Sequence, residues 1–112
     1  MNTPVNPLVP PNPPLIKFDT LVQTLGAPSR CAILGALSDG QPRMVNEIAK
    51  ITGLKPGAVS KQMAILLGAG LVELNQRLYR VPAAYVADAS KRHLDFGHCL
   101  LRLPDANGQP TM

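Results

Sequence analysis

Apolar residues recur at helical spacing through the centre of the chain and divide it into four short helices. Prolines at first turns and glycines at ends bound these segments, as helices commonly show. A short first helix is expected to be capped by Asp19 or Thr20 and to end at Leu25, and the other three lie at residues 28–38, 44–51 and 56–68. Their expected inward stripes are, in order, Leu21, Val22 and Leu25; Ile33, Leu34 and Leu37; Val45, Ile48 and Ala49; and Val59, Met63 and Leu66.

The fourth expected helix has two faces of different character. At about 100° per residue, Lys61 points away from the apolar stripe. Gly57, Ala58 and Ala64 share the side of Lys61. The exposed face is therefore flat and made of small residues around one lysine, which allows another backbone to approach closely.

Strand-forming residues follow the fourth helix. Residues 71–74 and 78–81 have strand character, and residues 75–77 form a short reversal between them. An isolated hairpin is marginally stable, so this one must pack on the helices. Residues 83–92 are expected to form a helical turn or two.

Residues 94–103 fit two patterns. Leu94, Phe96, His98 and Leu100 alternate as in a strand, whereas Phe96, Leu100 and Leu103 also share one face of a helix. We favour a strand because Gly97 would weaken a helix. The segment is too apolar to remain in water, so we expect it to form a dimer surface with the first helix. The expected dimerisation residues are Leu21, Leu25, Leu94, Phe96, Leu100, Leu101 and Leu103.

The two ends of the chain differ from its centre. Residues 1–17 are rich in proline, which removes amide donors and disfavours helix and sheet. We expect a flexible or polyproline II segment there. The alternative is a functional arm that lies across a partner subunit or along DNA. Residues 104–112 are expected to be disordered. The domain would then occupy residues 18–85, and residues 86–103 would be the dimerisation segment.

Composition restricts the class of protein without identifying it. A chain of 112 residues is one domain, and 11 Lys and Arg against 7 Asp and Glu permit contact with phosphate. The two cysteines form no CxxC pair, which suits a reduced, cytoplasmic compartment. Prolines interrupt each short apolar piece near the N-terminus, so we expect no signal peptide. No apolar run approaches about 20 residues, so we also expect no membrane partner.

The expected order of elements, three helices, a turn, a fourth helix and a hairpin, is that of a winged helix-turn-helix. The amino-acid sequence also resembles that of the ArsR-type bacterial repressors. The similar stretches are LGAPSRCAIL at residues 25–34, AVSKQM at 58–63, AGLV at 69–72 and LYRV at 78–81. The resemblance covers about residues 18 to 85. It implies a mainly α fold with a small β-hairpin (α+β) and a DNA-binding regulator.

The chain departs from that family where the family binds metal. Metal-sensing members carry a cysteine box in the third helix, whereas residues 44–48 here read MVNEI. Other members use spaced Asp, His and Glu ligands near the C-terminus, and this spacing is not found around Asp88, His93 and His98. The wing is also shorter than usual. We therefore expect no metal and no cofactor.

The polar residues of the fourth helix and the hairpin are the candidates for DNA contact. Lys61 and Ser60 suit the major groove, and Lys55 and Gly57 suit a phosphate at the helix start. Arg30 and Arg77 are expected to clamp the DNA backbone. Gln62 suits either a base contact or burial against a neighbouring helix. Arg80 could either contact DNA or form an ion pair on the surface. The candidates are Arg30, Lys55, Gly57, Ser60, Lys61, Gln62, Arg77 and Arg80.

The remaining reactive residues give weaker signals. Cys31 lies near a buried stripe, where a small inert thiol is the ordinary interpretation. His98 and Cys99 are neighbours on an expected strand, so they point to opposite faces and do not easily share one ion. No Ser/His/Asp set, carboxylate pair or phosphate loop is found, so we expect no enzymatic activity.

These observations favour a homodimeric, sequence-specific regulator of double-stranded DNA, a repressor acting in the cytoplasm at the nucleoid. A twofold dimer would place two copies of residues 56–68 in successive major grooves, about 34 Å apart. Two other functions stay open. One is a winged-helix adaptor that binds protein instead of DNA. The other is a thiol- or metal-responsive repressor that uses Cys99 or His98.

Overall fold

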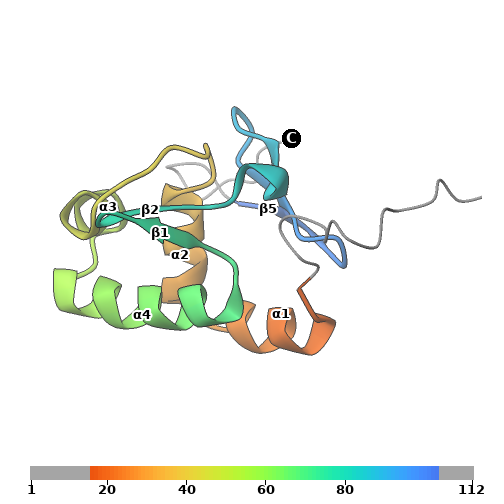
Figure 1. Cartoon of the computed structure of the whole chain (residues 1–112), viewed down its shortest axis with the longest axis horizontal. Coiled ribbons are helices and arrows are strands. Elements are labelled where there is room, and N and C mark those ends of the chain that lie inside the picture. Colours follow the sequence, from red (N-terminus) through yellow and green to blue (C-terminus); the bar gives the residue numbers. More distant parts are fainter. Residues whose placement is uncertain (1–15, 104–112) are drawn as a thin grey trace, which may run out of the picture.

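The computed structural model describes residues 16–103 and shows four helices followed by two small sheets (Figure 1). The proline-rich arm, apart from its last two residues, and the tail after residue 103 lie outside the described residues. The helices are α1 (Phe18–Leu25), α2 (Pro28–Ala36), α3 (Val45–Thr52) and α4 (Pro56–Ala69). The other elements are β1 (Glu73–Asn75), β2 (Leu78–Arg80), the 3-10 turn η1 (Ala83–Tyr85), β3 (Val86–Asp88), β4 (His93–Asp95) and β5 (Leu100–Arg102).

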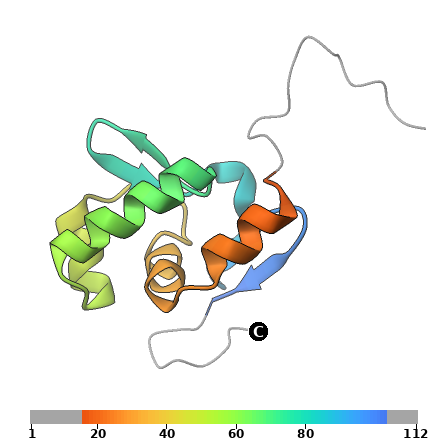
Figure 2. The same ribbon diagram turned by 90° about the horizontal axis from the view of Figure 1, so that it is seen from below.

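The helices surround a shared core, and the two sheets lie at different ends of it. In Figure 1, α4 and α1 follow one another along the lower edge, with the β1–β2 hairpin above α4. The second sheet, with strand order β3-β4-β5, lies at the end far from α3 (Figures 1 and 2). This order of elements is the winged helix-turn-helix arrangement, with β1–β2 as the wing.

The apolar stripes expected of α2, α3 and α4 form this core. Each of the following side chains is at most 6% exposed: Ile33, Leu34, Leu37, Ile48, Ala49, Val59, Met63 and Leu66. The stripe expected of α1 was wrong at Val22, which is 56% exposed. Adjacent helical residues are about 100° apart, so Val22 turns to solvent when Leu21 faces the core.

Glycines in the left-handed region end the two helices of the helix-turn-helix. Gly53 closes α3 at φ 77° and Gly70 closes α4 at φ 85°, and both donate their amides back to the preceding turn. Only glycine adopts this conformation without steric cost. Pro56 begins α4 in the first turn, where its missing amide breaks no helical hydrogen bond.

The wing is a tight antiparallel hairpin that the rest of the chain holds in place. Asn75 pairs with Leu78, so Gln76 and Arg77 alone make the turn. The backbone of Arg43 pairs with that of Tyr79 through two hydrogen bonds of 2.8 Å. The loop before α3 therefore adds a second, short pairing to the wing, on the free edge of β2.

The C-terminal segment was only partly predicted. Of residues 83–92, η1 alone is helical, and β3 and a turn take the rest. The strand expected over residues 94–103 is confirmed, but as two strands, β4 and β5, that reverse at Gly97 (φ 89°). The reversal lets Phe96 pack against Tyr85, with ring centroids 5.1 Å apart.

This reversal corrects part of the expected dimer surface. Leu21, Leu94, Phe96 and Leu103 are at most 3% exposed within one chain, so a second copy is not needed to cover them. Leu25 and Leu101 are partly buried against the same core. Leu100 alone of the expected set is well exposed, at 49%.

The wing turn yields a prediction about stability. Gln76 and Arg77 both have positive φ, at 52° and 70°, which two-residue hairpins ordinarily assign to Asn-Gly. We predict that Gln76→Asn with Arg77→Gly raises the free energy of unfolding by about 1 kcal/mol, because left-handed backbone is costly for other residues. Urea denaturation checks this; equal or lower stability would contradict it.

Candidate nucleic-acid interface

The outward face of α4 carries Gly57, Lys61, Ala64 and Gly68, which are all exposed, and it is flanked by exposed Ile65. These residues follow helical spacing and lie opposite the buried stripe of the same helix. No atom lies within 4 Å of the position that a Cβ would take at Gly57 or Gly68. The backbone of α4 is therefore open to a large partner along its length, and Lys61 stands out from it.

The positive charge of this surface is not neutralised by nearby acids. Lys55, Lys61 and Arg77 are exposed and form no ion pair within residues 16–103. α4 itself contains no Asp or Glu. Glu47 and Glu73, on α3 and β1, each lie against an arginine of their own. The surface is thus suited to a polyanion.

The start of α4 adds backbone donors to these side chains. Lys55 is the N-cap residue and makes no side-chain cap hydrogen bond. The first amides of a helix have no partner within the helix, and the helix dipole places partial positive charge there. Lys55 and Gly57 therefore lie where a phosphate oxygen is favoured. Ser60, exposed one turn later, adds a hydroxyl.

Arg30 and Gln62 lie between helices and not on the outward face. The guanidinium of Arg30 donates from Nη1 to Oε1 of Gln62 at 2.9 Å. Its Nε donates to the carbonyl oxygen of Thr24 at 2.7 Å. We expected Arg30 to clamp the DNA backbone. The structure corrects this expectation, because the guanidinium N–H groups of Arg30 donate to acceptors within the protomer. Two roles were expected for Gln62, a base contact or burial against a neighbouring helix. The structure shows the contact with the neighbouring helix.

Arg80 is paired across the wing. Its Nε donates to a carboxylate oxygen of Glu73 on the facing strand, and both side chains are about half exposed. Of the two alternatives for Arg80, the structure shows the surface ion pair. Arg77 at the turn forms no ion pair among the described residues, so its charge is available to an external partner.

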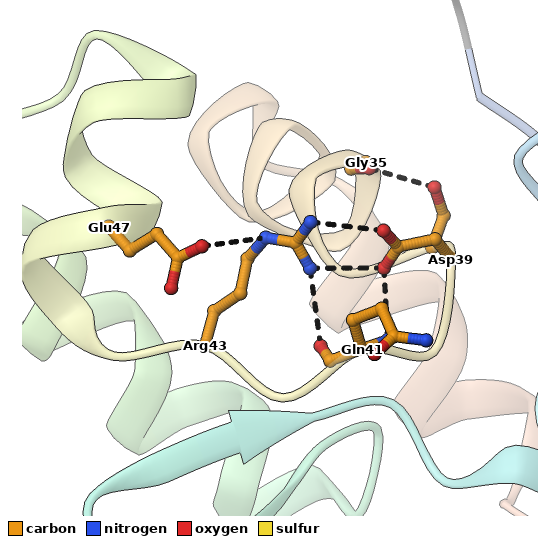
Figure 3. A network of polar contacts seen from close by, with 6 residues as sticks. Gly35, Asp39, Gln41, Arg43 and Glu47 are labelled. Carbon is orange, nitrogen blue, oxygen red and sulfur yellow. Dashed lines mark hydrogen bonds and ion pairs between the residues drawn. The ribbon is translucent and has the colours of Figure 1, made fainter.

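A polar network around Arg43 joins three elements, and sequence reasoning missed it (Figure 3). Nη1 and Nη2 contact the two carboxylate oxygens of Asp39 at 3.1 and 3.0 Å. Nε lies 3.5 Å from Glu47 on α3, close enough for an ion pair but without hydrogen-bond geometry. Since the Arg43 backbone also pairs with Tyr79, the network fixes the wing relative to α3 and to the turn that follows α2. The spacing of four residues between opposite charges was the available signal.

Both thiols have pKa values above the ordinary range of a cysteine. Burial raises the pKa of Cys31, although the charge of Arg30 opposes this, and Sγ donates to the carbonyl oxygen of Leu25 at 3.2 Å. Burial and the charge of Asp95 both raise the pKa of Cys99. The neighbouring ring of His98 packs edge-on against Phe18, with centroids 6.0 Å apart. Among the described residues, no three His, Cys, Asp or Glu side chains gather in a way that could hold a metal ion.

A shallow apolar groove lies beside the wing, between the first turn of α3 and the hairpin. It has a volume of about 300 Å³ and is lined by Met44, Val45, Asn46, Leu74, Arg77 and Tyr79. Within residues 16–103, none of the helices combines the length and the apolar character needed to cross a bilayer.

Comparison with known proteins identifies a family of regulators. The model of the family described as "bacterial regulatory protein, arsR family" matches residues 27–73, from the residue before α2 to the first residue of β1. No curated protein matches the chain, and no solved structure does either. The matched segment contains α3, α4 and the turn between them.

The environments of the thiols lead to a prediction about pH. A raised pKa leaves less thiolate in the folded protein than in the unfolded chain, and thiolate is the reactive form. We predict slower iodoacetamide labelling of the native protein than of the protein in urea at pH 8, with a rate–pH midpoint shifted upward. The same shifts make the thiols' contribution to stability fall as pH rises above the unfolded thiol pKa. Fast labelling of Cys99 at pH 7 would contradict this and favour a thiol-responsive protein.

Proposed function

The chain carries the helix-turn-helix domain of the ArsR-family DNA-binding transcriptional regulators, and from this premise we propose that it binds double-stranded DNA sequence-specifically as a homodimeric repressor. In this proposal α4 enters the major groove and the wing lies along the backbone. The protein would act in the cytoplasm, at the nucleoid.

The observation that carries the proposal is the open, uncompensated outward face of α4. Lys61 projects from a helix face whose other residues are mostly small, with exposed Ile65 at its edge, so the helix can approach the floor of the groove closely. A lysine can donate to guanine O6 or N7, and Ser60 can reach a base or a phosphate. With one strong donor on this face, modest sequence specificity is expected.

Affinity would come mainly from phosphates. Lys55 and the first amides of α4 would bind phosphates of one strand. Arg77, in the turn of the wing, would bind phosphates on the other side of the groove. The network around Arg43 supports this arrangement, because it holds the wing at a fixed place beside α3. Binding that relies on such contacts weakens steeply as salt rises.

The exposed apolar residues at the α1 end of the molecule supply a revised dimer surface. Phe18 and Val22, one turn apart on α1, are each 56% exposed. The contact between Phe18 and His98 brings the turn between β4 and β5 against α1, and Leu100 follows that turn. We propose that Phe18, Val22 and Leu100 meet their copies across a twofold axis.

The adaptor remains a second candidate because of the groove beside the wing. Its lining is largely apolar and includes the exposed side chains of Met44 and Leu74. A protein segment with apolar side chains would fit such a groove better than DNA would. The same binding assay separates the two functions.

The first test removes two charges from the proposed interface. We predict that Lys61→Ala with Arg77→Ala weakens binding to a random duplex and lowers the slope of log affinity against log salt by about 1 to 2. Fluorescence anisotropy at several salt concentrations measures both. Lys91→Ala with Arg102→Ala, on the C-terminal sheet, removes the same charge and should change neither. Equal effects of the two double variants would favour diffuse charge attraction, and no effect of the first would favour the adaptor.

Two glycines of α4 provide a matched pair. Gly57→Ala and Gly68→Ala each fill open space and favour helix, so both should stabilise the fold by about 0.5–1 kcal/mol. Only Gly57 lies in the half of α4 expected to enter the groove. We predict that Gly57→Ala weakens DNA binding by about 1 kcal/mol, roughly fivefold, and that Gly68→Ala leaves it unchanged. Urea denaturation and anisotropy give the two numbers; equal affinities would contradict the docking.

The dimer surface can be tested without disturbing the core. Val22→Lys with Leu100→Lys changes exposed positions only and would place like charges on the twofold axis. We predict that size-exclusion chromatography with light scattering gives a dimer mass for the natural protein and a monomer mass for this variant. Leu78→Lys, on the wing, should remain dimeric. A variant that stays dimeric would place the interface elsewhere.

A further inference from the structure

Arg30 connects three helices through one side chain. It lies in the first turn of α2. Its Nε and Nη2 donate to the carbonyl oxygens of Thr24 and Gln23 at 2.7 and 3.4 Å, and its Nη1 donates to Gln62 on α4 at 2.9 Å. One rigid, planar group therefore spans the end of α1 and the middle of α4.

The end of α1 depends on side-chain donors. Its C-cap, Gly26, has φ −75° and is not in the left-handed conformation that usually satisfies the last carbonyls of a helix. Arg30 donates to two of these carbonyls, and Cys31 donates to a third, that of Leu25. Thr24 is only 5% exposed, so its carbonyl would be costly to leave without a partner. These contacts fix Arg30 before it reaches α4.

The contact on α4 is next to the outward face. Gln62 is partly buried and directly follows Lys61 in the helix. A shift of Gln62 along or around the helix axis would move Lys61 with it. Because base contacts need close geometry, a small rotation of α4 would change which donor meets which base.

From this arrangement we propose that Arg30 is a positioning residue that sets the orientation of α4 relative to α1 and thereby determines sequence specificity. The inference rests on the proposed sequence-specific DNA binding. In the dimer, α1 carries the proposed subunit contact and α4 the base contacts. Arg30 then determines how the two copies of α4 are presented. A lysine cannot replace it, since one ammonium cannot take three acceptors in the plane of a guanidinium.

The experiment compares two duplexes. The full chain is first used to enrich a duplex from a pool of random DNA sequences. Anisotropy then gives the ratio of affinities for the enriched and a random duplex. The variants are Arg30→Lys, which keeps the charge, and Gln62→Met and Gln62→Glu, which remove and keep the Oε1 acceptor. Arg102→Lys, on β5, is the matched control.

We expect Arg30→Lys and Gln62→Met each to lower the ratio about tenfold, the scale of one mismatched base pair. The two changes together should lower it no further than either alone, because both act through one contact. Gln62→Glu should keep the ratio while weakening both duplexes through its charge. The salt slope on the random duplex should stay unchanged in Arg30→Lys.

Two results would overturn the inference alone. One is an unchanged ratio in Arg30→Lys and Gln62→Met with a duplex that the natural protein enriches. The other is a ratio lost equally in Gln62→Met and Gln62→Glu, which would make Gln62 a direct base contact. Gln62→Met leaves the caps of α1 in place, so the test stands even if Arg30→Lys does not fold. A natural protein that enriches no sequence would overturn the proposed function and this inference with it.

Discussion

Burial of one side of α4 is the constraint on which the rest of the structure depends. Val59, Met63 and Leu66 are fully buried, and burying a side chain of this size stabilises the fold by about 2 kcal/mol. Because these three residues occupy one face, Lys61 and the glycines must occupy the other. The orientation of the charged face is thus a consequence of packing, and no separate device is needed to expose it.

The remaining elements hold α4 in its surroundings. α2 and α3 supply the apolar residues against which its buried stripe packs, and glycines in the left-handed region stop α3 and α4. Polar ties then set the angles that apolar packing leaves adjustable. Arg43 relates the wing to α3 and to the turn that follows α2, and Arg30 joins the end of α1 to α4. Both arginines thus act within the protomer and support the surface that we propose meets DNA.

The sequence predicted the helical part of the fold well, because helical periodicity is a local signal. The boundaries of α3 and α4 and the inward residues of α2, α3 and α4 could be read from proline, glycine and apolar spacing. The C-terminal sheet could not, since its strands are only three residues long and its pairing depends on a reversal at Gly97. Apolar Leu94, Phe96 and Leu103 therefore suggested a partner subunit, whereas the chain itself covers them.

For the candidate site, the exposure of Lys55, Lys61 and Arg77 followed from the local sequence pattern. The contact of Arg30 with Gln62 depends on how distant segments pack, which a single sequence does not reveal. The pairing of Arg80 with Glu73 depends on the register of the hairpin, which its two-residue turn sets.

The most direct test of the buried-stripe, exposed-lysine arrangement is a titration of the isotopically labelled protein with a random DNA duplex, followed by amide NMR spectra. We expect the amide signals of Lys55, of residues 57–61 and of residues 76–77 to shift as duplex is added, while those of β3, β4 and β5 stay in place. Shifts confined to the C-terminal sheet or to the groove beside the wing, with α4 unchanged, would contradict it.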